Sequence, residues 1–188
     1  MSFENAFIDT IGLEGGYSND PGDPGGETKY GISKKQYPTI DIKNLTQTQA
    51  KEIYLKDYWE PLKLDSIPNQ RIHAEIFDTG VNCGVTTAIF IAQRAVNFLG
   101  LNIDEDGVMG PQTISTVNGL ASKDAEALFK ALNGFQFMRY VQIVGTSKDH
   151  RFARGWMRRI QGYRQEAGAA TEPTQSWWSK LFGKGGTA

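Results

Sequence analysis

EGGYSNDPGDPGGETKYGI, residues 14–32, is the stretch that decides how this chain folds and what chemistry it can hold. Six glycines and two prolines in these residues predict a turn-rich loop with exposed backbone. Before the loop, apolar residues recur at the spacing of an amphipathic helix, at Phe3, Phe7, Ile8 and Ile11. We expect Glu14 in the last turn of this helix, which Gly15 and Gly16 would end.

A carboxylate at a helix C-terminus faces the negative pole of the helix dipole, and partial burial acts in the same direction. Both effects raise the pKa of a glutamate. A glutamate that keeps its proton near neutral pH can act as a general acid and protonate a leaving-group oxygen. Glu14 is therefore a candidate catalytic residue.

The spacing of the polar residues in the loop is typical of a glycosidase. Eight residues separate Glu14 from Asp23, and Thr28 follows after four more. One carboxyl group would protonate the glycosidic oxygen, the other would activate a water or stabilise the transition state, and a hydroxyl would orient the water. Asp20 and Asp23 both precede Pro-Gly, where an aspartate often only caps a turn, so the choice of second carboxylate stays open.

This stretch resembles the signature of glycoside hydrolase family 108, the bacterial and phage N-acetylmuramidases, whose catalytic glutamate sits in a Glu-Gly-Gly-Tyr element. The family pattern continues as Asp-Pro-Gly-Gly-x-Thr-x-x-Gly-Ile, which residues 23–32 match. The order is also similar to that of phage-type lysozymes, although those place five residues before the threonine. The resemblance implies the catalytic residues Glu14, Asp23 and Thr28. The expected substrate-binding residues are Tyr17, Asp20, Tyr30, Tyr58, Trp59 and Asn82, with no cofactor and no metal.

Two further elements resemble the same family. Residues 54–59, YLKDYW, fall on a helix predicted from Gln47 onward, where aromatic side chains would either stack on sugar rings or belong to the core. Residues 77–84, FDTGVNCG, read as structural, with glycines that break a helix between Ile72 and Thr79. Asn82 would then cap the next helix or reach the substrate.

From residue 86 the chain resembles the C-terminal peptidoglycan-binding domain of the family. Residues 106–113, DGVMGPQT, predict a turn that feeds a new helix with Pro111 in its first turn. The segment from Asn102 imitates the start of a calcium loop. Position twelve is Thr113 instead of the required glutamate, so we reject a calcium site.

Helical spacing dominates the remaining sequence, notably in residues 87–99, 113–120 and 123–143. We therefore predict a mostly α fold. The resemblance implies the lysozyme-like superfamily, a helical bundle with a small β-hairpin or loop near the active site. We expect a muramidase domain over residues 1–85, a helical peptidoglycan-binding domain packed on it over 86–170, and a flexible tail over 171–188.

Charge is unevenly distributed along the chain. Residues 1–150 hold 13 basic and 19 acidic side chains, whereas residues 151–188 hold 7 basic and 2 acidic ones. Arg151, Arg154 and Arg158 would share a helical face, which we interpret first as solvated and second as a surface for anionic envelope polymers. This is a poor nucleic-acid signature, and the apolar tail residues around Trp177 and Trp178 are too few for stable membrane insertion. We expect a monomer.

The predicted function is hydrolysis of peptidoglycan between N-acetylmuramic acid and N-acetylglucosamine, for phage lysis or for toxin or protein release through the cell wall. We see no signal peptide, so a holin or an export machinery would deliver a cytoplasmic product to the periplasm. Two histidines and one cysteine, Cys83, argue against a zinc or cysteine peptidase. A chitinase-like glycosidase and a non-catalytic peptidoglycan-binding module remain as alternatives, and a retaining or inverting mechanism stays open.

Overall fold

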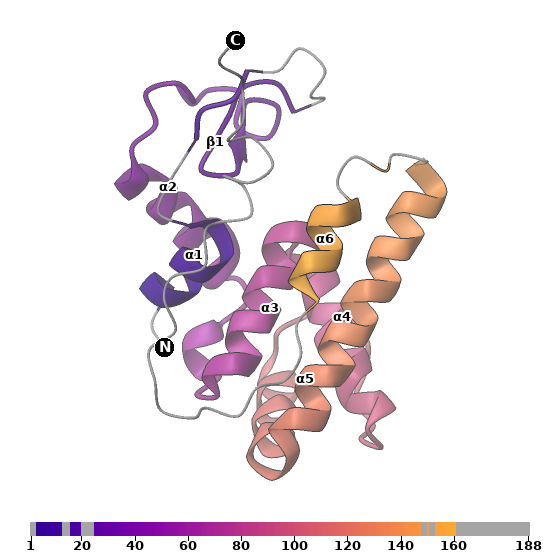
Figure 1. Cartoon of the computed structure of the whole chain (residues 1–188). Coiled ribbons are helices and arrows are strands. Elements are labelled where there is room, and N and C mark those ends of the chain that lie inside the picture. The colour runs from indigo at the N-terminus through magenta and orange to yellow at the C-terminus, as the bar shows by residue number, and fades with distance from the viewer. Residues whose placement is uncertain (1–2, 13–15, 20–24, 148–149, 151–152, 161–188) are drawn as a thin grey trace, which may run out of the picture. The chain divides into compact units, whose positions relative to one another are not determined.

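The computed structural model describes residues 3–12, 16–19, 25–147, 150 and 153–160. They form two compact units, whose described parts are residues 3–56 and residues 57–160 with the gaps just given. Helices dominate both units, and one small antiparallel sheet is present in the first (Figure 1). The prediction of a mostly α, lysozyme-like fold with a small hairpin is confirmed.

The first unit consists of α1 (Phe3–Ile11), β1 (Thr28–Lys29), β2 (Ile32–Ser33) and α2 (Gln47–Tyr54). A capping box starts α2, in which the Thr46 hydroxyl accepts from Gln49 N and the Gln49 side chain accepts from Thr46 N. The ring of Phe7 meets the ring of Tyr54 edge-on, with centroids 5.5 Å apart. This aromatic pair joins α1 to α2 in the core of the unit.

The second unit begins within the π-helix η1 (Leu55–Trp59), which is followed by the 3₁₀ helix η2 (Leu64–Ser66). Four α-helices complete it: α3 (Gln70–Cys83), α4 (Val85–Phe98), α5 (Pro111–Ser147) and α6 (Ala153–Arg159). Helices α3, α4 and α5 pack against one another, and α6 packs on α5 (Figure 1).

Helix α3 differs from the sequence prediction, because it runs through Gly80 without a break and ends at Cys83. Gly80 is needed for packing and not for a turn. A Cβ at this position would lie 2.7 Å from Leu62 Cδ1, well inside van der Waals contact. Asn82 therefore lies within α3, where its side chain donates to Asp78 O at 2.7 Å, and the N-cap of α4 is Gly84.

Helix α5 begins at Pro111, as the turn motif predicts, and consists of two helical segments joined at Asp124, which has non-helical dihedrals. The Asp124 carboxylate accepts a hydrogen bond from Ala127 N at 2.9 Å, as an N-cap residue does. The two helices predicted over residues 113–120 and 123–143 correspond to these segments.

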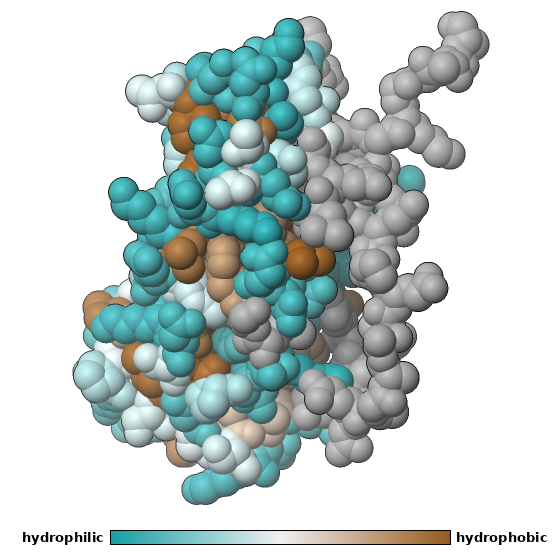
Figure 2. All heavy atoms as spheres, turned by 90° about the vertical axis from the view of Figure 1, so that its left-hand side faces the viewer, coloured by the Kyte–Doolittle hydropathy of each residue, from teal (hydrophilic) through white to brown (hydrophobic). Residues whose placement is uncertain are grey.

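Apolar side chains on the face shown in Figure 2 form small separate patches among hydrophilic residues. Among the helices of the described residues, none combines the length and the hydropathy that a membrane crossing requires.

Candidate active site

A short antiparallel bridge holds together the two ends of the segment that carries Asp20 and Asp23. Ser18 N donates to Thr28 O, and Thr28 N donates to Ser18 O, each at 2.8 Å. Asp20 and Asp23 themselves lie outside the described residues, as does Glu14. The bridge fixes the points at which the segment leaves and rejoins the folded unit.

The returning end of this segment is fixed by further backbone hydrogen bonds. Lys34 N donates to Glu27 O at 2.8 Å, and Lys35 N donates to Gly25 O at 3.1 Å. The Thr28 side chain is 8% exposed and its hydroxyl donates to Gly26 O at 3.2 Å. Because the hydroxyl hydrogen of Thr28 is already donated to Gly26 O, the Thr28 oxygen would accept a hydrogen bond from a water molecule.

A tight turn joins β1 to β2. Thr28 pairs with Ser33 and Lys29 with Ile32, which leaves Tyr30 and Gly31 as a two-residue connection. Both have positive φ, 51° and 75°, as a type I′ turn requires. Tyrosine rarely adopts this left-handed conformation, which costs roughly 1–2 kcal/mol for a residue with a Cβ.

A buried tyrosine holds this turn in place. The side chain of Tyr54 is 2% exposed, and its hydroxyl donates to Tyr30 O at 3.0 Å. The Tyr54 ring belongs to the core, as one of the two interpretations of residues 54–59 expects. Its only polar side-chain atom therefore connects the core of the unit to the strained tip of the hairpin.

Tyr17 lies directly before the bridge and is 39% exposed. Its hydroxyl donates to Glu27 Oε1 at 3.1 Å, and partial desolvation together with the Glu27 carboxylate raises the pKa of Tyr17. Glu27 was not among the residues singled out from the sequence. The bridge from Ser18 to Thr28 places Lys29 directly opposite Tyr17 and Glu27 diagonally beside it on the same face, a relation that depends on the register of the bridge and not on the sequence motif.

The expected position of Glu14 at a helix end is wrong, because α1 ends at Ile11. Gly12, with a φ of 86° and an N–H that donates to Ile8 O at 2.8 Å, takes the place proposed for Gly15 and Gly16. The first glycine after the apolar run is thus sufficient to end the helix.

Three of the predicted substrate-binding residues, Tyr58, Trp59 and Asn82, belong to the second unit. Trp59 is 2% exposed, its indole N–H donates to Asp65 Oδ1 at 2.9 Å, and its ring meets Phe77 edge-on at 5.5 Å. In this position the Trp59 ring offers almost no surface to a sugar. The residues that the structure brings together around the hairpin are Tyr17, Thr28 and Tyr30.

A buried acidic cluster lies between α3 and α5 in the second unit. Glu75 is 6% exposed, and desolvation, followed by the charge of Asp78, raises its pKa to about 8. Asp78 accepts from Gln136 Nε2 at 2.9 Å and forms an ion pair with the buried Arg159 of α6. Burial also raises the pKa of Cys83 to about 11, which keeps this thiol protonated and unreactive.

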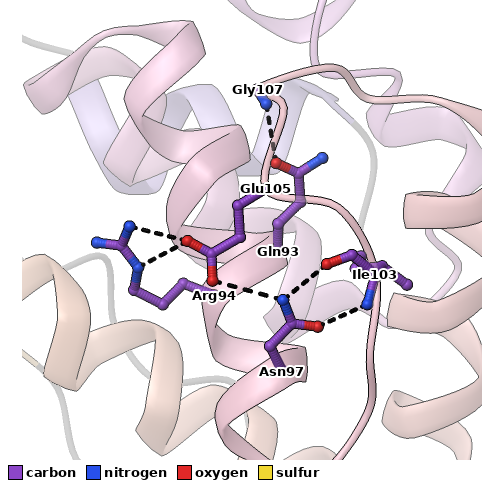
Figure 3. A network of polar contacts seen from close by, with 6 residues as sticks. All are labelled: Gln93, Arg94, Asn97, Ile103, Glu105 and Gly107. Carbon is purple, nitrogen blue, oxygen red and sulfur yellow. Dashed lines mark hydrogen bonds and ion pairs between the residues drawn. The ribbon is translucent and has the colours of Figure 1, made fainter.

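The turn motif of residues 106–113 is organised by a buried side chain that precedes it. Gln93 of α4 is 1% exposed, donates to Asp106 Oδ1 at 2.7 Å and accepts from Gly107 N at 2.9 Å. On the same helix, Arg94 binds Glu105 and Asn97 binds Ile103, both in the loop that leads into the motif (Figure 3). These contacts account for the motif as a structural connection between α4 and α5.

No three His, Cys, Asp or Glu side chains among the described residues are arranged to hold a metal ion. The described part of the candidate site therefore consists of a fixed hairpin, two aromatic side chains and a hydroxyl group. Such a surface can bind a saccharide through stacking and hydrogen bonds. The second carboxylate of a hydrolysis, Asp20 or Asp23, would come from the loop that the bridge closes, and the acid, Glu14, from the residues before it.

Comparisons with known proteins agree with these features. Residues 7–84 match the family described as Glycosyl hydrolase 108, and residues 87–161 match the family described as Predicted Peptidoglycan domain. Among solved structures, that of Brucella abortus SagA is similar, with 28% sequence identity and a TM-score of 0.67 over 84% of this chain and 88% of that chain. No curated protein matches the sequence.

Proposed function

Because the chain carries a domain of glycosyl hydrolase family 108 over residues 7–84 and a peptidoglycan domain over residues 87–161, we propose that it is an N-acetylmuramidase. The chain is a glycoside hydrolase directed at peptidoglycan. In the proposed reaction it cleaves the β-1,4 bond from N-acetylmuramic acid to N-acetylglucosamine. The expected division near residue 85 into a catalytic and a binding domain is part of the proposal.

In this mechanism Glu14 donates its proton to the glycosidic oxygen as the bond to the anomeric carbon breaks. Asp23, or Asp20 in its place, stabilises the positive charge that develops on the sugar or removes a proton from the attacking water. Thr28 would accept a hydrogen bond from that water. Whether the anomeric configuration is retained depends on the separation of the two carboxyl groups.

The observation that supports this assignment best is the bridge from Ser18 to Thr28. It pairs Ser18 with Thr28, the two described ends of the segment that carries both candidate aspartates. Catalysis by paired carboxylates needs such fixed positions, because a displacement of about 1 Å can cost about 10²-fold in rate.

The physiological setting belongs to the proposal as well. Peptidoglycan is the partner and the cell wall is the place of action. A phage-encoded enzyme would reach it through a holin, and a bacterial one through an export machinery that serves toxin or protein release. We propose that the enzyme acts as a monomer.

Digestion of purified sacculi tests the proposal. Wild type, Glu14→Gln and Glu52→Gln would be compared, with fragments reduced by borohydride and identified by mass spectrometry. Glu52 is an exposed glutamate of α2 and serves as the matched control. We expect reduced muramic acid ends from wild type and Glu52→Gln, and at least a hundredfold fewer from a folded Glu14→Gln.

Other fragments would identify the alternatives. Reduced glucosamine ends would indicate cleavage of the other glycosidic bond, and cut peptides would indicate a different chemistry. Binding without any fragments would favour the non-catalytic module. Cleavage of chitin oligomers at the rate of peptidoglycan would favour the chitinase-like hydrolase.

A further inference from the structure

We propose that Lys29 binds a carboxylate of the peptidoglycan substrate and thereby selects peptidoglycan over uncharged chitin. This inference rests on the proposed function and adds a residue that determines specificity. Lys29 directly follows Thr28 in β1 and precedes the strained turn at Tyr30. Because side chains alternate along a strand, Lys29 points away from the buried Thr28.

The ammonium group of Lys29 is held in position, and no carboxylate of the residues that the structure describes neutralises it. Its Nζ donates to Lys43 O at 3.0 Å and lies 5.8 Å from the centroid of the Tyr30 ring. No carboxylate of the described residues lies within ion-pair distance of it. A lysine ammonium has three donors, so two remain for a ligand.

Both supports of this ammonium group are themselves fixed. The Asp41 carboxylate accepts from Asn44 N at 3.2 Å and from Asn44 Nδ2 at 2.9 Å, which closes the turn that presents Lys43 O. These hydrogen bonds lower the pKa of Asp41. Tyr30 is held through its carbonyl by Tyr54. The lysine is thus positioned before any ligand arrives, which reduces the entropy cost of binding.

Neighbouring charged groups have partners of their own. The Glu27 carboxylate accepts from the Tyr17 hydroxyl at 3.1 Å. Lys34, which directly follows β2, donates to Ile40 O at 2.7 Å. Lys29 therefore presents a cation next to the exposed Tyr17 and the half-buried Tyr30, where a glycan strand would bind.

The chemistry of the substrate matches this cation. Peptidoglycan carries carboxylates in two places, on the stem peptide and on the lactyl group where the peptide has been removed. Chitin has the same β-1,4 backbone without any carboxylate. An ammonium group beside Tyr17 and Tyr30 therefore gives a charge-assisted hydrogen bond to peptidoglycan that chitin cannot form.

The test uses the full chain as wild type, Lys29→Gln, Lys29→Arg and Lys35→Gln. Lys35 is an exposed lysine of the same hairpin, so its substitution matches the change in net charge. Soluble glycan strands would be prepared intact, stripped of stem peptides by an amidase, and with all carboxylates converted to amides. Binding of fluorescently labelled strands and release of reducing ends would both be measured, at low and high salt.

We expect Lys29→Gln to lose about tenfold in binding and in kcat/KM on carboxylate-bearing strands, mainly through KM, and less than twofold on amidated strands. Lys29→Arg should recover most of the loss. A loss on stripped strands assigns the lactyl carboxylate, and a loss on intact strands only assigns the stem peptide.

Equal effects of Lys29→Gln and Lys35→Gln, or an equal loss on amidated strands, would overturn the inference while leaving the hydrolase intact. Conversely, binding that depends on Lys29 without release of reducing ends from any strand would refute the proposed hydrolysis and retain the carboxylate site.

Discussion

The buried carboxyl group of Glu75 makes the stability of the second unit depend on pH in an unusual direction. In the unfolded chain its pKa would be near the ordinary value of 4.5, whereas burial raises the folded value to about 8. Between these values the folded chain keeps a proton that the unfolded chain has released. Raising the pH from 4.5 to 8 therefore destabilises the folded state, and above pH 8 the effect is complete.

The size of the effect follows from the two pKa values. Each unit of difference corresponds to 1.36 kcal/mol, so ionisation of Glu75 costs the folded state at most about 5 kcal/mol at high pH. The Glu75→Gln variant has nearly the same shape and cannot ionise. We expect it to have about the stability of wild type at pH 5 and to be more stable by a few kcal/mol at pH 8.5.

Amide hydrogen exchange of α3 and α5 between pH 5 and pH 9 measures this effect in the second unit itself. Glu126→Gln is the matched control, because Glu126 is exposed on α5 and pairs with the exposed Lys130. It should shift stability by less than about 0.5 kcal/mol at any pH. A wild-type stability that is flat or rising from pH 5 to 8, or a Glu75→Gln variant with an unchanged pH dependence, would refute the reasoning.

Three further substitutions test the packing of the second unit, at Gly80 and Gly119, and of the first unit, at Tyr54. Gly80→Ala should destabilise the chain by about 1–3 kcal/mol in urea unfolding, because the new Cβ would lie 2.7 Å from the buried Leu62. Gly119→Ala in α5, where the Cβ would meet no atom within 4 Å, should instead be neutral or stabilise by up to about 1 kcal/mol. Tyr54→Phe removes only the hydroxyl that holds Tyr30 and should cost about 1 kcal/mol by the same assay; no loss would mean that the hairpin tip holds its own conformation.

Periodicity was sufficient to predict the helices whose packing follows one apolar face. The predicted helix over residues 87–99 corresponds to α4, and the gap between the two predicted segments of α5 falls close to Asp124. Local signals were also sufficient for the start of α5 at Pro111. These helices and the start of α5 depend on residues that are close in the sequence, so they can be predicted from a single sequence.

Two helix ends were predicted wrongly for opposite reasons. At Gly80 a glycine was read as a break, although tertiary packing against Leu62 requires the absence of a side chain inside a continuous helix. At Gly12 a glycine was passed over, although it ends α1 before the motif begins. Composition alone does not separate these two uses of glycine.

The roles of Glu27 and Lys29 follow from contacts with residues that are distant in the sequence. Glu27 matters because the bridge from Ser18 to Thr28 brings it beside Tyr17. Lys29 matters because a distant carbonyl, that of Lys43, holds its ammonium group. A sequence motif points to candidate catalytic side chains. The groups that hold such side chains in position come from tertiary contacts, which the spacing of residues in the sequence does not predict.

The two units are stabilised in different ways, and this determines what a substitution in each should change. The first unit fixes its hairpin and loop largely by single hydrogen bonds, such as that from Tyr54 to Tyr30, each worth about 1 kcal/mol. Losing one alters the position of a residue without unfolding the chain, so its effect should appear in binding and turnover. The second unit buries Glu75 and the ion pair of Asp78 with Arg159 between its helices. Removing one partner of a buried pair leaves an uncompensated charge, so Asp78→Asn should reduce stability before it reduces the affinity for peptidoglycan.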